Sequence, residues 1–237
     1  MMTNLKWRSC GMFLMIVVLM NGCLKSDPPG PNTPKTFISL MHLAPTAPAL
    51  DVYFNDNRVS NNAFTPGAVT SGYNGVDHGF FTVKFKKAGA DSLVTEIPQA
   101  LYDSMSFYTL MIYNEQVDGP AKVLRIRDDF AGLASTKPYY RFFHASPNIA
   151  EVDLYIDNVL IESDRSHADN TGFELYNKFS EIASGSHTLE VRLAGTGTVV
   201  ATTNIELIQG NAYTFYLKGL EGGTGNNQVT LSVLRAV

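Results

Sequence analysis

The chain contains one sequence pattern twice, and this repeat constrains the fold more than any other feature. Residues 37–45 (FISLMHLAP) return as residues 139–147 (YYRFFHASP). The spacing continues past this match, because four positions each recur 102 residues later: His42, Pro45, Asp51 and Tyr53 as His144, Pro147, Asp153 and Tyr155. A repeat of about 100 residues has the length of a small domain. We therefore expect two copies of one domain in tandem.

The N-terminus has the features of a bacterial lipoprotein signal. Lys6 and Arg8 precede an apolar run over residues 11–20, which ends before Gly22 and Cys23. This is the layout of a secretory signal, and the run is shorter than the roughly 20 residues that span a bilayer. Gly22 directly before Cys23 resembles a lipobox, where the signal is cut before a lipidated cysteine. We predict a signal peptide over residues 1–22 and lipidation at Cys23.

A proline-rich tether follows the lipidation site. Residues 23–35 contain four prolines and one glycine, which oppose helix and sheet. The short stretch from Lys25 to Asp27 resembles the charged export tags of Bacteroidetes-type surface lipoproteins. We expect an outer-membrane lipoprotein whose domains lie in the periplasm or on the cell surface.

Charge and cysteine content narrow the partners. The 18 basic and 22 acidic residues are mixed along the chain, without the basic patch of a nucleic-acid binder. Anchorage to a membrane is therefore expected through the lipid alone. The only other cysteine, Cys10, lies inside the signal peptide, so the mature domains are expected to fold without a disulfide. No cofactor and no metal is predicted.

The rest of the chain has the pattern of β-strands. Residues 50–55 and 152–157 alternate apolar and polar side chains, and each run ends in a polar turn that suits a hairpin. Residues 80–85 are matched with 188–193, and residues 108–113 with 213–218. About seven short strands per copy predict two tandem immunoglobulin-like or transthyretin-like β-sandwich domains. We place them at residues 36–134 and 139–237, joined by a short linker.

The second copy carries a family signature. Its residues 144–155 read HASPNIAEVDLY, and this pattern resembles the opening signature of a bacterial family named domain of unknown function 4397. The first copy keeps most of the pattern, with Leu43-Ala44 in place of Ala-Ser. The resemblance covers both halves after the tether. It implies exported β-rich modules in tandem and no established activity.

The repeated positions allow a functional and a structural interpretation. His42 and His144 could each be a metal ligand, or a base supported by Asp51 or Asp153. Alternatively, each is a partly buried histidine whose ring bonds backbone groups at a turn, which is the commoner situation for a single histidine. The repeated prolines suit turns or strand edges. We favour the structural role for all eight positions: His42, Pro45, Asp51, Tyr53, His144, Pro147, Asp153 and Tyr155.

No motif for catalysis is present in the sequence. It contains no zinc-protease signature, no nucleophile elbow and no phosphate loop. Asp128 and Asp129 are adjacent acids, but neighbours on a strand point to opposite faces, so we expect a solvated edge or loop there. We therefore predict that the protein is not an enzyme.

Aromatic residues give the only binding signal. Most are expected to pack in the cores and across strands. Where two occur in succession, as at residues 139–140 and 142–143, one of each pair faces away from the core and covers the domain junction or a partner. The aromatic residues considered are Tyr73, Phe80, Phe81, Tyr102, Phe107, Tyr108, Tyr113, Tyr139, Tyr140, Tyr176, Tyr213 and Tyr216.

These features predict a lipid-anchored, non-catalytic envelope protein that binds a glycan or a protein partner. One alternative is a structural spacer or an assembly subunit whose strand edges pair with other chains. The third hypothesis is a hydrolase with an unrecognised site.

Overall fold

The computed structural model describes residues 33–172 and 174–237. The chain from Thr33 to Val237 forms one compact unit. The predicted signal peptide, Cys23 and the tether up to residue 32 lie outside the described residues. Within the described part, no helix is both long enough and apolar enough to cross a membrane.

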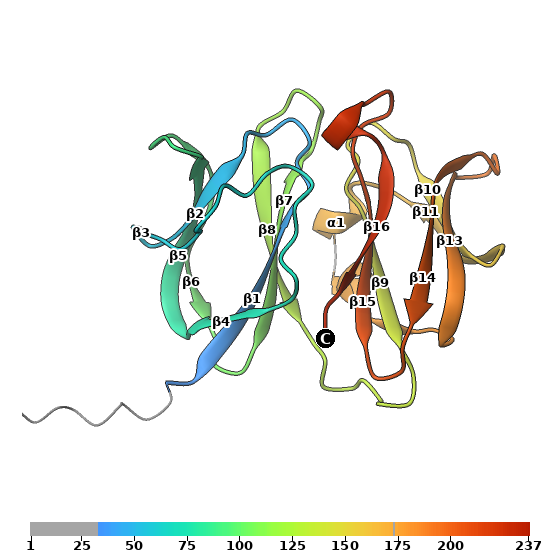
Figure 1. The fold of residues 1–237 in the computed structure, drawn as a ribbon, viewed down its shortest axis with the longest axis horizontal. Helices are drawn as coiled ribbons and strands as arrows, with labels where there is room; N and C mark the ends of the chain where they lie inside the picture. The colour runs from blue at the N-terminus through green and yellow to red at the C-terminus, as the bar shows by residue number, and fades with distance from the viewer. Residues whose placement is uncertain (1–32, 173) are drawn as a thin grey trace, which may run out of the picture. The chain divides into compact units, whose positions relative to one another are not determined.

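The first repeat is a sandwich of two four-stranded sheets, coloured blue to green in Figure 1. One sheet has the order β4-β1-β7-β8 and the other the order β3-β2-β5-β6. The strands are β1 (Lys35–His42), β2 (Leu50–Phe54), β3 (Asn57–Arg58), β4 (Asn74–Asp77), β5 (Gly79–Lys87), β6 (Leu93–Tyr102), β7 (Phe107–Asn114) and β8 (Ala121–Asp128).

The second repeat has the same strand order, coloured yellow to red in Figure 1. Its sheets are β12-β9-β15-β16 and β11-β10-β13-β14. The strands are β9 (Tyr139–His144), β10 (Val152–Ile156), β11 (Val159–Arg165), β12 (Ser180–Glu181), β13 (Gly185–Leu193), β14 (Val199–Leu207), β15 (Ala212–Lys218) and β16 (Thr230–Arg235). Short helical turns also occur, at α1 (Asp169–Gly172), η1 (Glu174–Asn177) and η2 (Gly225–Asn227).

The sheet order confirms two tandem sandwiches and separates the two expected types. The first and seventh strands of each repeat run parallel, while the other ladders are antiparallel. In immunoglobulin constant domains the first, second, fourth and fifth strands share a sheet. Here the first and fourth strands share a sheet with the seventh and eighth instead. Of the two expected sandwich types, this leaves the transthyretin-like one.

Local sequence explains the central hairpin of each repeat. The turn after β2 contains Asn55 at φ 53°, and the turn after β10 contains Asp157 at φ 49° and Asn158 at φ 65°. Asparagine and aspartate tolerate this left-handed conformation, which primed hairpin turns require. The alternation in β2 and β10 then places one row of side chains in the core.

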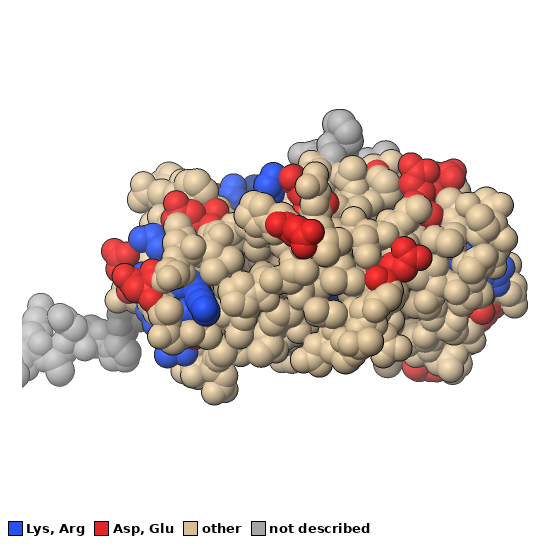
Figure 2. All heavy atoms as spheres, turned by 90° about the horizontal axis from the view of Figure 1, so that it is seen from above, with Lys and Arg blue, Asp and Glu red and all other residues tan. Residues whose placement is uncertain are grey.

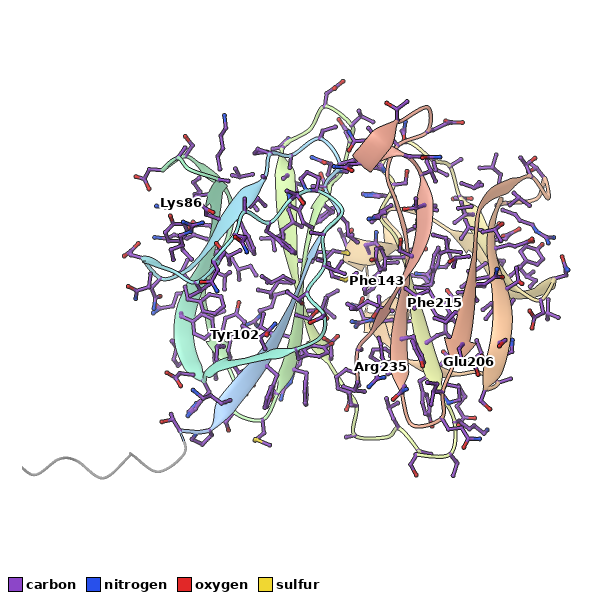
Figure 3. The ribbon with its side chains drawn as sticks, viewed as in Figure 1. Lys86, Tyr102, Phe143, Glu206, Phe215 and Arg235 are labelled. Carbon is purple, nitrogen blue, oxygen red and sulfur yellow. The ribbon has the colours of Figure 1, made fainter. Side chains whose placement is uncertain are left out.

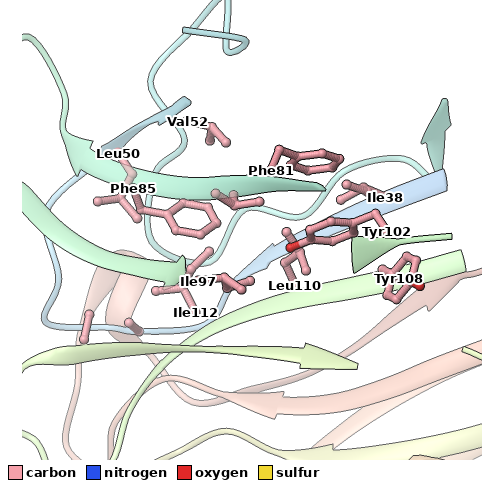
Figure 4. Packing of buried hydrophobic residues seen from close by; sticks show 13 residues of the cluster. Ile38, Leu50, Val52, Phe81, Phe85, Ile97, Tyr102, Tyr108, Leu110 and Ile112 are labelled. Carbon is pink, nitrogen blue, oxygen red and sulfur yellow. The ribbon is translucent and has the colours of Figure 1, made fainter. Parts of the chain in front are cut away.

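Each sandwich encloses its own apolar core. In the first, the rings of Phe81 and Tyr102 stack at 4.1 Å over the β-branched and leucine side chains of both sheets (Figure 4). In the second, Phe142 and Phe215 take the central places, and Figure 3 labels Phe215 within this sandwich. Apolar packing and hydrogen bonds therefore hold each domain together, without a disulfide between described residues.

One predicted strand match is wrong by two residues. In β5, Phe85 pairs with the middle of β2, and the residue at the same place of β13 is Val191 rather than Leu193. A shift by two leaves every side chain on its correct face, because the side chains of a strand alternate with a period of two. The match of residues 108–113 with 213–218 agrees with the observed register.

Candidate functional site

The two signature histidines hold the loop that follows the first strand of each sandwich. His42 ends β1, and its Nε2 lies 3.0 Å from the carbonyl oxygen of Pro48. His144 ends β9, and its Nε2 lies 3.1 Å from the carbonyl oxygen of Ala150. Both histidines are fully buried. A buried ring that bonds a carbonyl six residues ahead closes the loop between the two sheets.

Burial also keeps these rings neutral. Loss of hydration lowers the pKa of His144 to about 4, and the neighbouring His167 adds a smaller lowering. The pKa of His42 is lowered too, again mainly by burial. A carbonyl oxygen only accepts hydrogen bonds, so in each repeat the ring Nε2–H is the donor. With its proton donated to the carbonyl, Nε2 has no free lone pair with which to accept another proton as a base.

The signature aspartates cap a turn instead of supporting the histidines. Asp51 accepts a hydrogen bond from the backbone N–H of Gly89 at 3.1 Å, and Asp153 accepts one from Gly195 at 3.4 Å. Both glycines have positive φ, 72° and 66°, which favours glycine. Among the described residues, neither carboxylate bonds a histidine. The hypothesis of a base supported by an aspartate therefore finds no such pair in this structure.

The signature tyrosines lie on the outer face of the same sheets, each beside a cation. Lys86 Nζ is 4.8 Å from the ring centroid of Tyr53, and the guanidinium carbon of Arg192 is 4.1 Å from that of Tyr155. The two cations hold equivalent places, because each pairs across the ladder with the signature aspartate of its repeat. These contacts are repeated surface interactions of a cation with an aromatic ring.

The remaining predicted positions are the prolines and the lipidation site. Pro45 and Pro147 each begin the turn after the first strand of their repeat. Pro45 is buried and Pro147 is half-buried. Cys23 lies outside the described residues, so its lipidation stays a prediction.

A hollow of about 370 Å³ on the second sandwich gathers hydroxyl, imidazole and carboxylate groups. His187 Nδ1 lies 2.7 Å from the carboxylate of Asp157, and its Nε2 lies 3.1 Å from the carbonyl of Ala183. The hydroxyl of Ser186 bonds Glu206, which Figure 3 labels. The serine and the histidine therefore do not form a nucleophile and base pair. In the described ranges, no group of three or more His, Cys, Asp or Glu side chains is placed to hold a metal ion.

Asp128 is buried, which corrects the expectation of a solvated edge or loop. It ends β8, and its carboxylate accepts hydrogen bonds from the hydroxyls of Thr109 and Tyr73, both at 2.6 Å. It also forms an ion pair with Arg141. The adjacent Asp129 is exposed, so the two acids do point to opposite sides as predicted. The side that Asp128 takes is covered by the second sandwich.

Arg141 belongs to β9, so this ion pair joins the two repeats. The side chains of its two members are 1% and 0% exposed. Arg141 Nε donates to the Thr214 hydroxyl at 2.9 Å, and Nη2 donates to the Thr109 hydroxyl at 3.0 Å. Its guanidinium carbon lies 4.8 Å from the ring centroid of Phe143 and 4.6 Å from that of Phe179. We call Tyr73, Thr109, Asp128, Arg141 and Thr214 the junction network.

Tyr73 completes this network as a donor. Burial, and then the charge of Asp128, raise the pKa of Tyr73 above its ordinary value. The phenol therefore stays protonated and donates a hydrogen bond to the carboxylate. Thr109 donates to the same carboxylate and accepts from Arg141, so the network satisfies its members on both sides of the junction.

An apolar cluster surrounds the network. We call it the junction cluster; its buried members are Met41, Leu43, Met111, Ile126, Phe143, Ala145, Tyr216 and Leu234. Phe143 is the outward ring of the successive pair at residues 142–143 (Figure 3). Of the two predicted roles, contact with a partner and cover of the domain junction, it has the second.

A groove of about 1120 Å³ lies beside the junction network. It follows β8, which is an edge strand of its sheet, and continues along the linker to the segment after η1. Its lining residues are Met105, Ser106, Phe107, Arg125, Ile126, Arg127, Asp128, Asp129, Phe130, Ala131, Gly132, Leu133, Tyr139, Asn177, Lys178 and Phe179. We call it the junction groove, and it is the candidate functional site.

Aromatic rings form the apolar wall of the junction groove. Phe130 is the central ring: its centroid lies 5.2 Å from that of Phe107 and 5.2 Å from that of Phe179. Three exposed cations, Arg125, Arg127 and Lys178, line the groove. Arg125 already donates to the carbonyl of Leu101 and Arg127 to the hydroxyl of Ser106, and each guanidinium has further N–H groups. A cavity with aromatic walls and a few polar groups has the composition of a ligand-binding site.

Two rings of this wall, Phe130 and Phe179, are absent from the aromatic residues considered in the sequence. Phe130 lies between β8 and β9, and Phe179 follows η1, so neither ring belongs to a strand pattern in the sequence. The sequence does contain a signal for Arg141. It is a charged residue on the outward face of its strand, between the aromatic residues Tyr139 and Phe143 on the same face. An apolar outward row indicates a strand buried on both faces, and β9 is buried along its whole length.

Comparison with known families agrees with the resemblance found in the sequence. The family model described as Domain of unknown function (DUF4397) matches residues 36–155 and 138–235. One match begins with each repeat, and the two together cover most of the chain. No curated protein matches the chain. The chain belongs to the family described as Domain of unknown function (DUF4397), which it carries in tandem.

Proposed function

We propose that this protein is a non-catalytic binding module of a bacterial cell envelope and that its junction groove binds a glycan. The groove is the single observation that carries the proposal. Its aromatic wall offers ring faces for stacking on sugars, and its cationic rim offers hydrogen-bond donors for sugar oxygens. A protein partner that inserts an apolar side chain is the other form of the same proposal.

The way the walls are held supports binding to a preformed site. Phe179 packs on the guanidinium of Arg141, and Phe130 packs edge-on against Tyr73, whose hydroxyl bonds Asp128. The groove walls are thus fixed by the junction network. A ligand that meets rigid rings loses less of its binding free energy to ordering of the site.

The location of this module is part of the same proposal. The signal peptide over residues 1–22, Cys23 and the proline-rich tether support attachment to the outer membrane through an N-terminal lipid, as in Bacteroidetes-type lipoproteins. Nucleic acid is not proposed as a partner, because the view in Figure 2 shows acidic and basic side chains interspersed among broad uncharged areas.

Binding of soluble envelope polysaccharides to the purified full chain tests the glycan proposal. We expect saturable binding that falls roughly tenfold or more in Phe130→Ala, since this ring lies at the centre of the wall. Phe80→Ala is the matched control, because Phe80 is 67% exposed and does not line the groove. Equal loss in both variants, or binding that neither variant changes, contradicts the groove as the site.

Protease treatment of intact cells tests the location, with Cys23→Ser as the control that loses its membrane fraction. Digestion in intact cells supports surface display. Protection until the outer membrane is opened supports a periplasmic role. Recovery of the wild-type chain in the soluble fraction contradicts the lipid anchor.

Assembly through a strand edge is a second candidate function, and one observation favours it. The groove runs along β8, whose outer edge has no strand partner among the described residues. An extended segment of another chain could add to such an edge by backbone hydrogen bonds. Self-association of the full chain without any glycan, lost when proline replaces Arg127 in β8 and retained in Arg127→Ala, would support this function.

A further inference from the structure

The junction cluster is built from equivalent positions of the two repeats. Met41 and Phe143 are related by the 102-residue repeat. Met41 pairs across its sheet with Met111, and Phe143 pairs in the same way with Tyr216. The same correspondence holds for the other members, because Ile126 and Leu234 pair with Thr109 and Thr214. Each sandwich therefore uses the same surface to contact the other, as in the self-complementary interface of a twofold dimer.

Contacts at the rim of the junction confirm this reciprocity. Tyr113 and Lys218 are equivalent, since each follows the residue that pairs with the signature histidine of its repeat. The ring of Tyr113 lies 5.9 Å from that of His167, in the connection after β11. Lys218 Nζ donates at 2.8 Å to the carbonyl of Gly67, in the matching connection of the first repeat. Each repeat thus reaches the same loop of its partner.

The charged pair is where the two surfaces differ. The residue of the first repeat equivalent to Arg141 is Ser39. The residue of the second repeat equivalent to Asp128 is Ala236, which lies opposite Ala212 as Asp128 lies opposite Phe107. At the buried centre of the junction, one surface therefore carries an acid and the other a base, at positions that are neutral in the opposite copy. Lys218, at the rim, bonds a carbonyl and has no acidic counterpart in this contact.

This asymmetry favours contact between a first and a second repeat, the unlike pair, over contact between two copies of the same repeat, the like pair. Two first-repeat surfaces would bury two carboxylates without an arginine, and two second-repeat surfaces would bury two guanidinium groups without a carboxylate. A buried charge that lacks its partner strongly disfavours an interface. Only the unlike pair satisfies both groups.

We propose that this face is a pairing surface whose partner is the unlike repeat, selected by Asp128 and Arg141, and that a second copy of this chain can supply that repeat. The linker brings the two repeats together within one chain, which raises their effective concentration and favours the closed single chain. The surface itself does not require the linker, because its contacts come from the sheets and their loops.

Full-length variants that give both repeats the same charge test this proposal. Arg141→Ser with Ala236→Asp places an acid on both surfaces, and Ser39→Arg with Asp128→Ala places a base on both. The swapped control carries all four substitutions and moves the ion pair to the symmetry-related positions. All proteins are purified in detergent, checked for β-structure by circular dichroism, and measured by urea unfolding and by sedimentation mass.

We expect the wild-type chain to unfold in a single cooperative transition and each like-charged variant to unfold in two steps. An equimolar mixture of the two variants should double the sedimentation mass, because their surfaces complement each other between chains. The swapped control should unfold in one transition as a monomer. Like-charged variants that keep the wild-type transition, a mixture that gains no mass, or a swapped control that unfolds in two steps would overturn the proposal.

Discussion

The two repeats share their scaffold and differ at the positions where they meet each other and the solvent. Both place a histidine at the end of the first strand, an aspartate on a glycine turn and a tyrosine beneath a cation. They differ in the third strand, which has two residues in β3 and seven in β11. They differ again at the junction, where only one copy has the acid and only the other has the base. Positions that repeat maintain the sandwich, and positions that diverge make the pair asymmetric.

The third strand shows how the second repeat acquired contacts of its own. Arg165 ends β11, is buried, and donates through Nη2 to the carbonyl of Phe142 at 3.0 Å. It also pairs with Glu162 and Asp169, and Tyr176 lies 4.4 Å from its guanidinium carbon. The first repeat fills the same connection with an irregular loop, linked by bridges such as Met41 to Val69. The added strand length thus comes with a buried cation that the first repeat lacks.

Breaking the junction pair should have the largest effect on stability. Arg141→Ala leaves Asp128 buried without a cation, and Asp128→Ala leaves the guanidinium unpaired. Each change should lower the free energy of unfolding by about 3–5 kcal/mol. Urea unfolding followed by circular dichroism measures the loss. A change of under about 1 kcal/mol in both variants would mean that the pair is hydrated in solution.

The second largest effect on stability is expected at acid pH. The pKa of His144 is about 4 in the folded chain, against 6.5 for the ordinary side chain. Between these two pH values the histidine is protonated in the unfolded state and neutral in the folded state. Stability from the neutral ring is therefore complete above pH 6.5 and is lost as the pH falls towards 4. The loss should reach about 3 kcal/mol.

Unfolding free energies measured from pH 7 to pH 4 test this expectation. His144→Gln keeps an N–H donor and should reduce the pH dependence by the share that belongs to His144. His42→Gln is the matched change in the first repeat, where the pKa of the histidine is also lowered by burial. A pH dependence as steep in His144→Gln as in the wild-type chain would assign the acid sensitivity to groups other than His144.

The signature aspartates should contribute comparably in both copies, although each also has one partner of its own: Arg58 for Asp51 and the backbone N–H of Asp164 for Asp153. Asp51→Ala and Asp153→Ala each remove the acceptor for the N–H of a turn glycine, Gly89 or Gly195. Both glycines are exposed, so water can bond the freed N–H, and each loss should be about 0.5–1.5 kcal/mol. Thermal or urea unfolding of the two variants checks the equivalence. A large loss in only one copy would show that the shared aspartate serves different roles.

The smallest effect is expected at the signature tyrosines. Tyr155→Leu and Tyr53→Leu remove the ring from beneath Arg192 or Lys86, an interaction of about 0.5–1 kcal/mol at an exposed site. Tyr155→Leu should lose slightly more, because its cation lies closer. A loss of several kcal/mol would instead indicate that these rings have a packing role in the sheet.

The scaffold was predictable from the sequence because its signals are local. Alternation in β2 and β10, the turn residues after them and the repeated signature are all read within a few positions. The one slip, at residues 188–193, arose because a shift by two keeps the same side-chain pattern. The aspartates' turn contacts were not predicted, since Gly89 and Gly195 lie about 40 residues away along the chain.

The junction could be predicted only in part, because its contacts join surfaces that sequence periodicity does not relate. Alternation showed that Phe143 leaves the core, but not which surface covers it. The sequence predicts a solvated acid at Asp128 because its partners come from the loop before β4, from β7 and from β9, and no local pattern connects these segments. A direct comparison of the copies at Ser39 and Arg141 would have revealed the asymmetry. The groove rings Phe130 and Phe179 have no periodic signal at all.

The most direct test of the account is a double-mutant cycle between Asp128→Ala and Arg141→Ser, measured as urea unfolding of the full chain. These substitutions place at each position the residue of its equivalent in the other repeat. We predict that the double variant is more stable than the sum of the single losses implies, with a coupling energy of at least about 2 kcal/mol. Additive losses would contradict the claim that this buried pair joins the two repeats.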